Sequence, residues 1–354
     1  MKHYLVALFV IGNFTLGFSQ EASVKLKDLE IPTTPGFAVL DEAPTQIETN
    51  TMSKAFVINL ISQIAQTKGL PQNYGVIITP FWFIKTDDMT ATKFWGLNHA
   101  AHSPIRLTSV SLASVGQVDK LNRNVTNVSL GIKMPLLEYR AKSHLEKVNT
   151  SRTAFLGEVE KLAIRYPTAN VDFLEAKMDS VSEQSDYSSL LQAKPLFSLE
   201  IAAAANQVFV NQNYHNNAIS RVGVWATAQY AQSLKEDNSA YINASVLGRY
   251  LYDQTQFDVN SKRLTTQFLD AGGKLEFEYD KLSVAYEAIF RRDMVAATND
   301  FRHSGILKYR VLDNTYFTGS FGKNFGTTQN LIAFMGVNLG ILNSKESVND
   351  TPSQ

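Results

Sequence analysis

The residues of this chain best placed to do chemistry are charged side chains that recur at every second position of several short segments. Around Lys274, for example, Glu276 and Glu278 follow at intervals of two. Residues two apart lie on the same face of a β-strand. Charges that share a confined face are expected to form ion pairs, because an isolated buried charge is costly. The candidate site residues that share this placement are Lys133, Glu200, Arg221, Arg249, Asp270, Lys274, Glu276, Glu278, Glu287, Arg291, Lys308 and Arg310.

Residue patterns typical of enzymes are missing from this chain. It has no cysteine, no HExxH helix, no GxSxG turn and no glycine-rich phosphate loop. A histidine near a serine on a barrel rim could form a deacylase-like site, but no spacing singles one out. His99 and His102 share a loop without an evident third metal ligand. We therefore predict no enzyme activity, no cofactor and no metal site.

Period-two alternation is the main structural signal, and it is clearest in residues 264–279. There Leu275 and Phe277 alternate with the charged positions. Strands of about ten residues with one apolar and one polar face are typical of transmembrane barrels. A soluble β-sandwich or a lipocalin-like barrel is the alternative. Eleven segments show the pattern: 73–85, 105–117, 125–137, 196–209, 219–231, 240–252, 264–279, 283–291, 307–311, 316–321 and 331–341.

The fold class predicted from these segments is all-β, a transmembrane antiparallel β-barrel over residues 73–342. A barrel with both ends in the periplasm needs an even number of strands, so we predict about twelve. The missing strand is expected between Thr86 and Pro104 or beside a helical insertion at residues 138–193. Short turns such as Asp280-Lys281 are typical of the periplasmic side, and counting back from them places the insertion there.

The N-terminal part is expected to differ from the barrel. Residues 1–19 have a short basic start, an apolar core and small residues before Gln20, as in a signal peptide. Residues 20–72 are predicted to be a plug or a periplasmic segment. They include an amphipathic helix over Met52–Gln66, whose apolar positions are spaced as on a helix face. Residues 343–354 form a polar tail.

Several stretches of sequence resemble a known group of proteins. IPTTPGFAVLDEAPTQI, NYGVIITPFWF and KPLFSLEIAAA, together with the closing FGKNF and NLIAFMGVNLG, resemble an uncharacterised outer-membrane β-barrel family of Bacteroidota. The resemblance covers most of the mature chain. It implies a barrel fold and a place in the cell outer membrane, and it implies no activity.

The functional hypotheses rest on the charged residues expected inside the predicted barrel. Both signs are nearly balanced and the interior of such a barrel is narrow, so we expect the lumen to be closed by ion pairs and the N-terminal segment. The first hypothesis is a scaffold or accessory subunit with outer-membrane lipid and other envelope proteins as partners. The second is a gated channel for small solutes, in which deletion of residues 21–66 should raise permeability. The third is a lipid-modifying enzyme using His99, His102, His215 or His303. Zero formal net charge gives no reason to expect nucleic acid as a partner.

Overall fold

The computed structural model describes most of the barrel. Its described residues are 34–41, 57–61, 74–80, 107–118, 122–166, 190, 193–211, 219–236, 238–258, 262–312, 315–326 and 331–340. Several predictions lie outside them: the signal peptide at 1–19, the polar tail at 343–354, and His99, His102 and His215.

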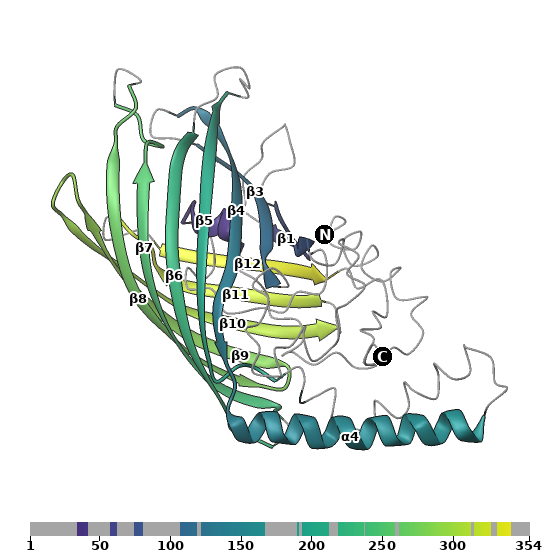
Figure 1. Ribbon diagram of the computed structural model, residues 1–354. Helices are drawn as coiled ribbons and strands as arrows, with labels where there is room; N and C mark the ends of the chain where they lie inside the picture. Colours follow the sequence, from purple (N-terminus) through teal and green to yellow (C-terminus); the bar gives the residue numbers. More distant parts are fainter. Residues whose placement is uncertain are drawn as a thin grey trace, which may run out of the picture.

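Antiparallel strands make up most of the described chain and close into a barrel (Figure 1). Each strand pairs with its neighbours along the chain, and β1 pairs with β12 to complete the ring. The predicted antiparallel barrel of about twelve strands is confirmed. The twelve described strands are β1 (Val57–Ile61), β2 (Tyr74–Ile78), β3 (Ser109–Val118), β4 (Asn124–Tyr139), β5 (Phe197–Val210), β6 (Ile219–Ser233), β7 (Ala240–Asp253), β8 (Thr266–Tyr279), β9 (Leu282–Asp293), β10 (Asn299–Leu312), β11 (Thr315–Lys323) and β12 (Leu331–Gly340).

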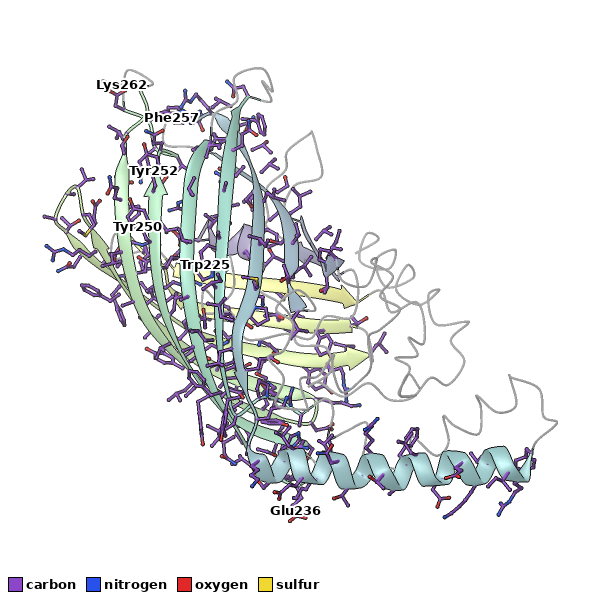
Figure 2. The ribbon with its side chains drawn as sticks, viewed as in Figure 1. Trp225, Glu236, Tyr250, Tyr252, Phe257 and Lys262 are labelled. Atoms are coloured by element: carbon purple, nitrogen blue, oxygen red, sulfur yellow. The ribbon has the colours of Figure 1, made fainter. Side chains whose placement is uncertain are left out.

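The two faces of the barrel wall have opposite chemistry. In β8, Lys274 and Glu276 are buried, whereas Leu275 between them is 64% exposed. Trp225 and Tyr250, both labelled in Figure 2, mark the difference, because Trp225 is 4% exposed and Tyr250 is 41% exposed. Large apolar side chains on the outside include Leu130, Ile132, Val224, Val246, Leu275, Val284, Phe290, Leu307, Val311 and Phe321. Polar side chains inside and apolar ones outside reverse the arrangement of a water-soluble protein.

The predicted helix over Met52–Gln66 is wrong at its centre. Val57–Ile61 is strand β1, which pairs with β12 on one side and β2 on the other. The barrel therefore begins at Val57 instead of at residue 73, and β1 is the strand missing from the sequence count. The predicted position of that strand, between Thr86 and Pro104 or beside the helical insertion, is wrong. Three of its five residues are β-branched, which suits a strand. The long-range pairing supplies backbone partners that local apolar spacing does not reveal.

The insertion between β4 and β5 carries the long helix α4 (Lys142–Arg165), as the sequence predicted. Its 24 residues span about 36 Å, and in Figure 1 it extends away from one end of the barrel. Leu145 and Val148 near its beginning are buried, whereas Ile164 near its end is 73% exposed. No helix in the described part of the chain is long and apolar enough to cross a bilayer.

The end of the barrel next to α4 also carries a two-residue turn. Asp280 and Lys281 alone connect β8 and β9. Lys194, which follows the insertion, pairs with Glu278 at the end of β8 at 2.7 Å. The insertion and the tight turn therefore lie at the same end, as counting along the predicted strands requires.

Candidate functional site

The predicted charged residues line the inside of the barrel. Their exposures are all below 8%: Lys133, Glu200, Arg221, Arg249, Asp270, Lys274, Glu276, Glu278, Glu287, Arg291, Lys308 and Arg310. The period-two pattern puts them on the same wall face as other buried polar residues. Each forms an ion pair, and together the pairs form two main networks and smaller contacts.

One network lies toward the α4 end of the barrel. The Glu276 carboxylate contacts Lys308 at 2.8 Å and Lys274 at 3.3 Å, and it accepts a hydrogen bond from Ser283 at 2.6 Å. Two buried cations and one buried carboxylate from β8 and β10 are thus held together.

Isolated ion pairs neutralise other charges on the inner face of the wall. Lys133 lies 3.8 Å from Glu200 across β4 and β5. Arg310 lies 3.6 Å from Asp280 in the tight turn. Such pairs offset the cost of placing charges in a barrel interior.

The second network surrounds a segment that is not part of the wall. Thr34–Asp41, here called the plug segment, contains the four-residue helix α2 (Pro35–Ala38). Thr34 caps this helix by accepting a hydrogen bond from the Phe37 amide, and Pro35 occupies its first turn. The IPTTPGFAVLD stretch therefore has the local signals of a short, rigid turn of helix.

Two serines on the wall hold the plug segment by its backbone. Ser111 of β3 accepts a hydrogen bond from the Gly36 amide at 3.1 Å. Ser129 of β4 donates to the Gly36 carbonyl at 2.6 Å. The backbone amide and the backbone carbonyl of Gly36 are therefore both hydrogen-bonded to side chains of the wall.

Glycines in the wall let the plug segment approach closely. A Cβ atom at Gly75 would collide with the Phe37 ring, and one at Gly131 would lie 2.5 Å from the Cβ of Pro35. Backbone without a side chain is thus required opposite both plug residues. The wall is shaped to receive this segment.

The apolar side chains of the plug segment form the largest buried cluster in the described chain. Phe37, Ala38, Val39 and Leu40 are each at most 6% exposed. Their partners from the wall are Ala113, Val115, Ala202, Ala204, Trp225, Leu247, Leu251 and Ile289. Burial of these groups stabilises the segment inside the barrel.

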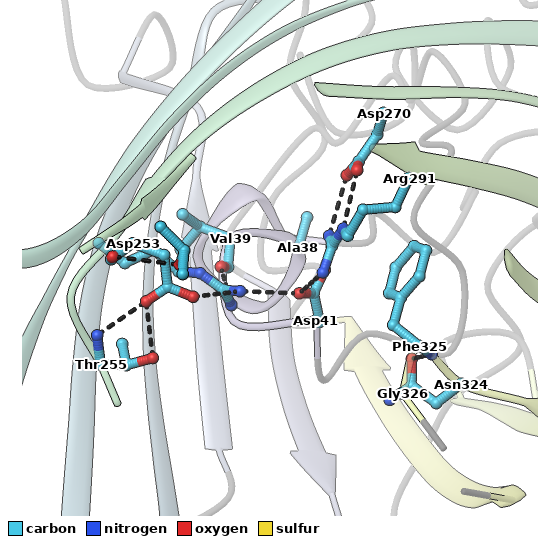
Figure 3. A network of polar contacts seen from close by, with 12 residues as sticks. Ala38, Val39, Asp41, Asp253, Thr255, Asp270, Arg291, Asn324, Phe325 and Gly326 are labelled. Atoms are coloured by element: carbon cyan, nitrogen blue, oxygen red, sulfur yellow. Dashed lines mark hydrogen bonds and ion pairs between the residues drawn. The ribbon is translucent and has the colours of Figure 1, made fainter. Parts of the chain in front are cut away.

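The end of the plug segment is clamped by arginines from three strands (Figure 3). The Asp41 carboxylate accepts from Arg291 at 2.8 and 2.9 Å through both guanidinium nitrogens. It also accepts from Arg221 at 3.0 Å and from Arg249 at 2.9 Å. Such charge-assisted, forked hydrogen bonds are among the strongest that proteins form.

The same arginines also bind peptide carbonyls of the plug segment. Arg221 donates to the Val39 carbonyl and Arg249 to the Ala38 carbonyl, both at 2.9 Å. Arg302 of β10 reaches the Asp41 carbonyl at 3.4 Å. The arginine cluster, defined here as Arg221, Arg249, Arg291 and Arg302, thus donates hydrogen bonds to both the carboxylate and the backbone carbonyls of the plug segment.

Acidic residues of the wall fix the arginines in place. Asp253 pairs with Arg221 at 2.8 Å, and Glu287 lies 3.5 Å from Arg302. Asp270 pairs with both Arg249 and Arg291. Arg291 also lies between two aromatic rings, 4.7 Å from the centre of Phe268 and 3.7 Å from that of Phe325.

These contacts set the charge state of Asp41. Burial alone would raise the pKa of its carboxyl group, but the charges of Arg291, Arg221 and Arg249 hold that pKa well below the ordinary value. Asp41 therefore carries its charge at all ordinary pH values.

Three residues of the ion network around the plug segment were not predicted from the sequence. Arg302 continues the alternation of Lys308 and Arg310 toward the start of β10, so extending that strand would have found it. Asp253 follows Arg249 in the same way at the end of β7. Asp41 gave no local signal, because its partners lie 180 to 250 residues away.

The described histidines do not gather at a site. His303 lies on the outside of β10 beside the rings of Tyr286 and Phe301, at 6.2 and 5.7 Å. His144 lies in α4, where burial and the nearby charge of Arg140 lower its pKa to about 4. Among the described residues, no group of three histidines, aspartates or glutamates could hold a metal ion.

Comparison with known proteins gives distant matches only. No family model matches the chain, and no curated protein sequence matches it. Among solved structures, the NanC porin aligns with a TM-score of 0.33 and 7% identity, over 66% of this chain and 94% of the porin. The transport unit of the autotransporter AIDA-I from Escherichia coli aligns with a TM-score of 0.30 and 6% identity, over 89% of this chain and all of that one. Similarities this low transfer neither a substrate nor an activity to this chain.

Proposed function

We propose that this chain is an outer-membrane β-barrel protein, closed by its own plug segment, that acts as a scaffold or accessory subunit of an envelope complex. The observation that carries the proposal is the clamp on Asp41, which ties the plug segment to β6, β7 and β9 inside the barrel. A lumen blocked in this way favours a role carried by the outer surfaces of the barrel over a role in free passage.

The outer-membrane location rests on the barrel wall. Its outside carries many exposed apolar side chains, and its strands leave no open edge because β1 and β12 pair. A closed barrel with an apolar outer face satisfies its backbone groups in a bilayer. The signal-like N-terminus and the resemblance to Bacteroidota barrels support the same location.

The insertion supports the scaffold role. Helix α4 leaves the end that carries the tight Asp280-Lys281 turn, and short turns are typical of the periplasmic side. Beyond its first turns its side chains are largely exposed, including Glu158 and Lys161. A long exposed helix on the periplasmic side offers a surface to another envelope protein.

A pull-down from native outer membranes tests this role. A tagged full-length copy is extracted in mild detergent, and its partners are identified by mass spectrometry with crosslinking. We expect a stoichiometric partner whose crosslinks fall on the 138–193 insertion. A protein recovered alone would contradict the accessory-subunit role.

A matched variant locates the contact. Arg140 donates to the Ala193 carbonyl, so the two ends of the insertion lie together. Replacing residues 142–192 by a short glycine-serine linker should therefore leave a folded, heat-modifiable barrel that no longer retains the partner. Full retention by this variant would place the contact elsewhere.

A second function, a gated channel for small solutes, is favoured by the chemistry of the clamp. The plug segment is held at its end by one carboxylate, and charge pairs can be exchanged without breaking the barrel ladder. Deleting residues 21–66 cannot test this, because it would remove β1. Deleting residues 34–41 leaves all twelve described strands, and it should produce a conductance that the full-length protein lacks.

A further inference from the structure

We propose that the arginine cluster is a carboxylate-binding site, which Asp41 occupies while the lumen is closed and which a small carboxylate-bearing solute takes when Asp41 leaves. The proposal goes beyond the scaffold role and rests on the placement of the plug segment in the lumen. It assigns a ligand class to residues Arg221, Arg249, Arg291 and Arg302.

The geometry of the cluster matches a carboxylate. Arg291 presents both terminal nitrogens to the two Asp41 oxygens, in the forked arrangement suited to a planar anion. Arg221 and Arg249 approach the same two oxygens from other strands. Four hydrogen bonds from three side chains thus converge on one carboxylate.

The net charge of the arginine cluster and its acidic wall partners is balanced by one negative charge. Its four arginines face three acidic residues of the wall, Asp253, Asp270 and Glu287, which leaves one positive charge. Asp41 supplies the fourth negative charge. A monocarboxylate restores the same balance, whereas a phosphate dianion does not.

The cluster is built by the wall and does not depend on the plug segment for its shape. Asp270 contacts Arg249 and Arg291 at 2.6 and 2.8 Å, and both of its oxygens are used. Arg249 and Arg302 are 2% and 0% exposed. Arginines held by wall partners stay in position when Asp41 is removed, so the site is preorganised for another anion.

Chemical rescue of an Asp41→Gly variant tests the proposal. Asp41 has a φ of 61°, which glycine adopts freely, so this change removes the carboxylate and keeps the backbone. The chain has no cysteine, and Ala38 in the plug segment is 0% exposed. An Ala38→Cys change therefore provides a single thiol whose rate of labelling reports release of the plug.

The measurement uses the purified full-length protein in lipid nanodiscs. The thiol should react at least about tenfold faster in A38C/D41G than in A38C alone, because the clamp is lost. Sodium acetate should slow it again in a saturable way, by binding between the arginines. Sodium chloride at equal ionic strength controls for screening, and sodium phosphate tests whether any oxyanion suffices.

Matched variants separate binding from general salt effects. A38C/D41N keeps an amide in the space of the carboxylate, so acetate should not slow its labelling. A38C/E158Q removes an exposed carboxylate on helix α4, outside the arginine cluster, and keeps Asp41, so its thiol should stay protected. Thermal unfolding of D41G without the cysteine gives an independent measurement, and acetate should raise its midpoint while leaving the wild type unchanged.

The outcomes decide between the alternatives. Acetate protection specific to D41G supports the site. Equal effects of acetate and chloride, or no faster labelling in D41G than in its parent, would overturn it. Phosphate acting as well as acetate would overturn the assignment to carboxylates. None of these results bears on the pull-down, so the scaffold role stands or falls separately.

Discussion

Asp41 joins parts of the barrel that are far apart in the chain. Its carboxylate contacts arginines of β6, β7 and β9, at sequence separations of 180, 208 and 250 residues. Removing one member of a buried ion network leaves the other charges without compensation, which is more destabilising than the pair itself is stabilising. We therefore expect removal of this one carboxylate to loosen the plug segment in the lumen.

The low pKa of Asp41 predicts how the plug responds to pH. A carboxyl group whose folded-state pKa lies below its unfolded value of 3.8 stabilises the fold fully above that value, and this is lost as pH falls through the folded pKa. The charged groups that face Asp41 from the wall are Arg221, Arg249, Arg291 and Arg302, and Asp270 pairs with two of them. We therefore expect the plug segment to stay in place from pH 8 down to pH 5, which is about one unit above the unfolded-state pKa of 3.8.

Trp225 provides the measurement, because it packs in the cluster that contains Val39. In a W82F/W95F background its emission should be constant across this pH range and shift only in stronger acid. A shift centred near pH 6 would show that a histidine, not the Asp41 clamp, governs the plug.

Gly75 offers a second test at the scale of a residue. A valine there would place its Cβ against the Phe37 ring, so the G75V change should displace the plug segment. We expect faster labelling of the A38C thiol and a loss of stability of about 1–3 kcal/mol from overpacking. Gly248 on β7 has open space around its Cβ position, so G248V should change neither quantity. Equal behaviour of the two variants would mean that the contact of Phe37 with the wall does not hold the plug.

The strands explain why most of the fold follows from the sequence. Long strands such as β8 carry enough alternating residues to fix both their type and the face they bury. Strand β1 has only five residues, and the spacing of its apolar positions fits a helix as well as a strand. Its type is decided by pairing with β12 at the other end of the chain, which no local pattern contains.

The same contrast between local pattern and distant pairing explains which residues of the site could be predicted from the sequence. The wall residues share the period of their strands, so Arg249 and Asp270 could be placed inside from sequence alone. The clamp could not be predicted, because the plug segment has no strand pattern and its partners are distant in the chain. The sequence indicates which charges face inward, and the fold determines which of them meet.

The outer face of the strands provides a prediction at the scale of an element. Val246 lies in the middle of β7 and is 61% exposed, so it should face lipid. A V246R change should lower the free energy of unfolding in bilayers by about 2–4 kcal/mol, the cost of a cation near the membrane midplane. Val295 is 59% exposed in the connection between β9 and β10, where V295R should cost at most about 1 kcal/mol. Urea unfolding in lipid vesicles measures both, and equal costs would argue against a membrane-spanning wall.

The whole molecule combines a wall with an apolar outer face and a charged interior that holds a segment of the same chain. The ring of strands leaves no edge, the plug segment lies inside the barrel, and the ion network around Glu276 joins the inner faces of β8, β9 and β10. Helix α4 extends from the end with the tight turn.

Conductance of the purified full-length protein in a planar lipid bilayer tests the closed barrel most directly. The account predicts insertion without a steady current, and a stable current from the variant that lacks residues 34–41. A large, steady conductance from the unmodified protein would contradict the account.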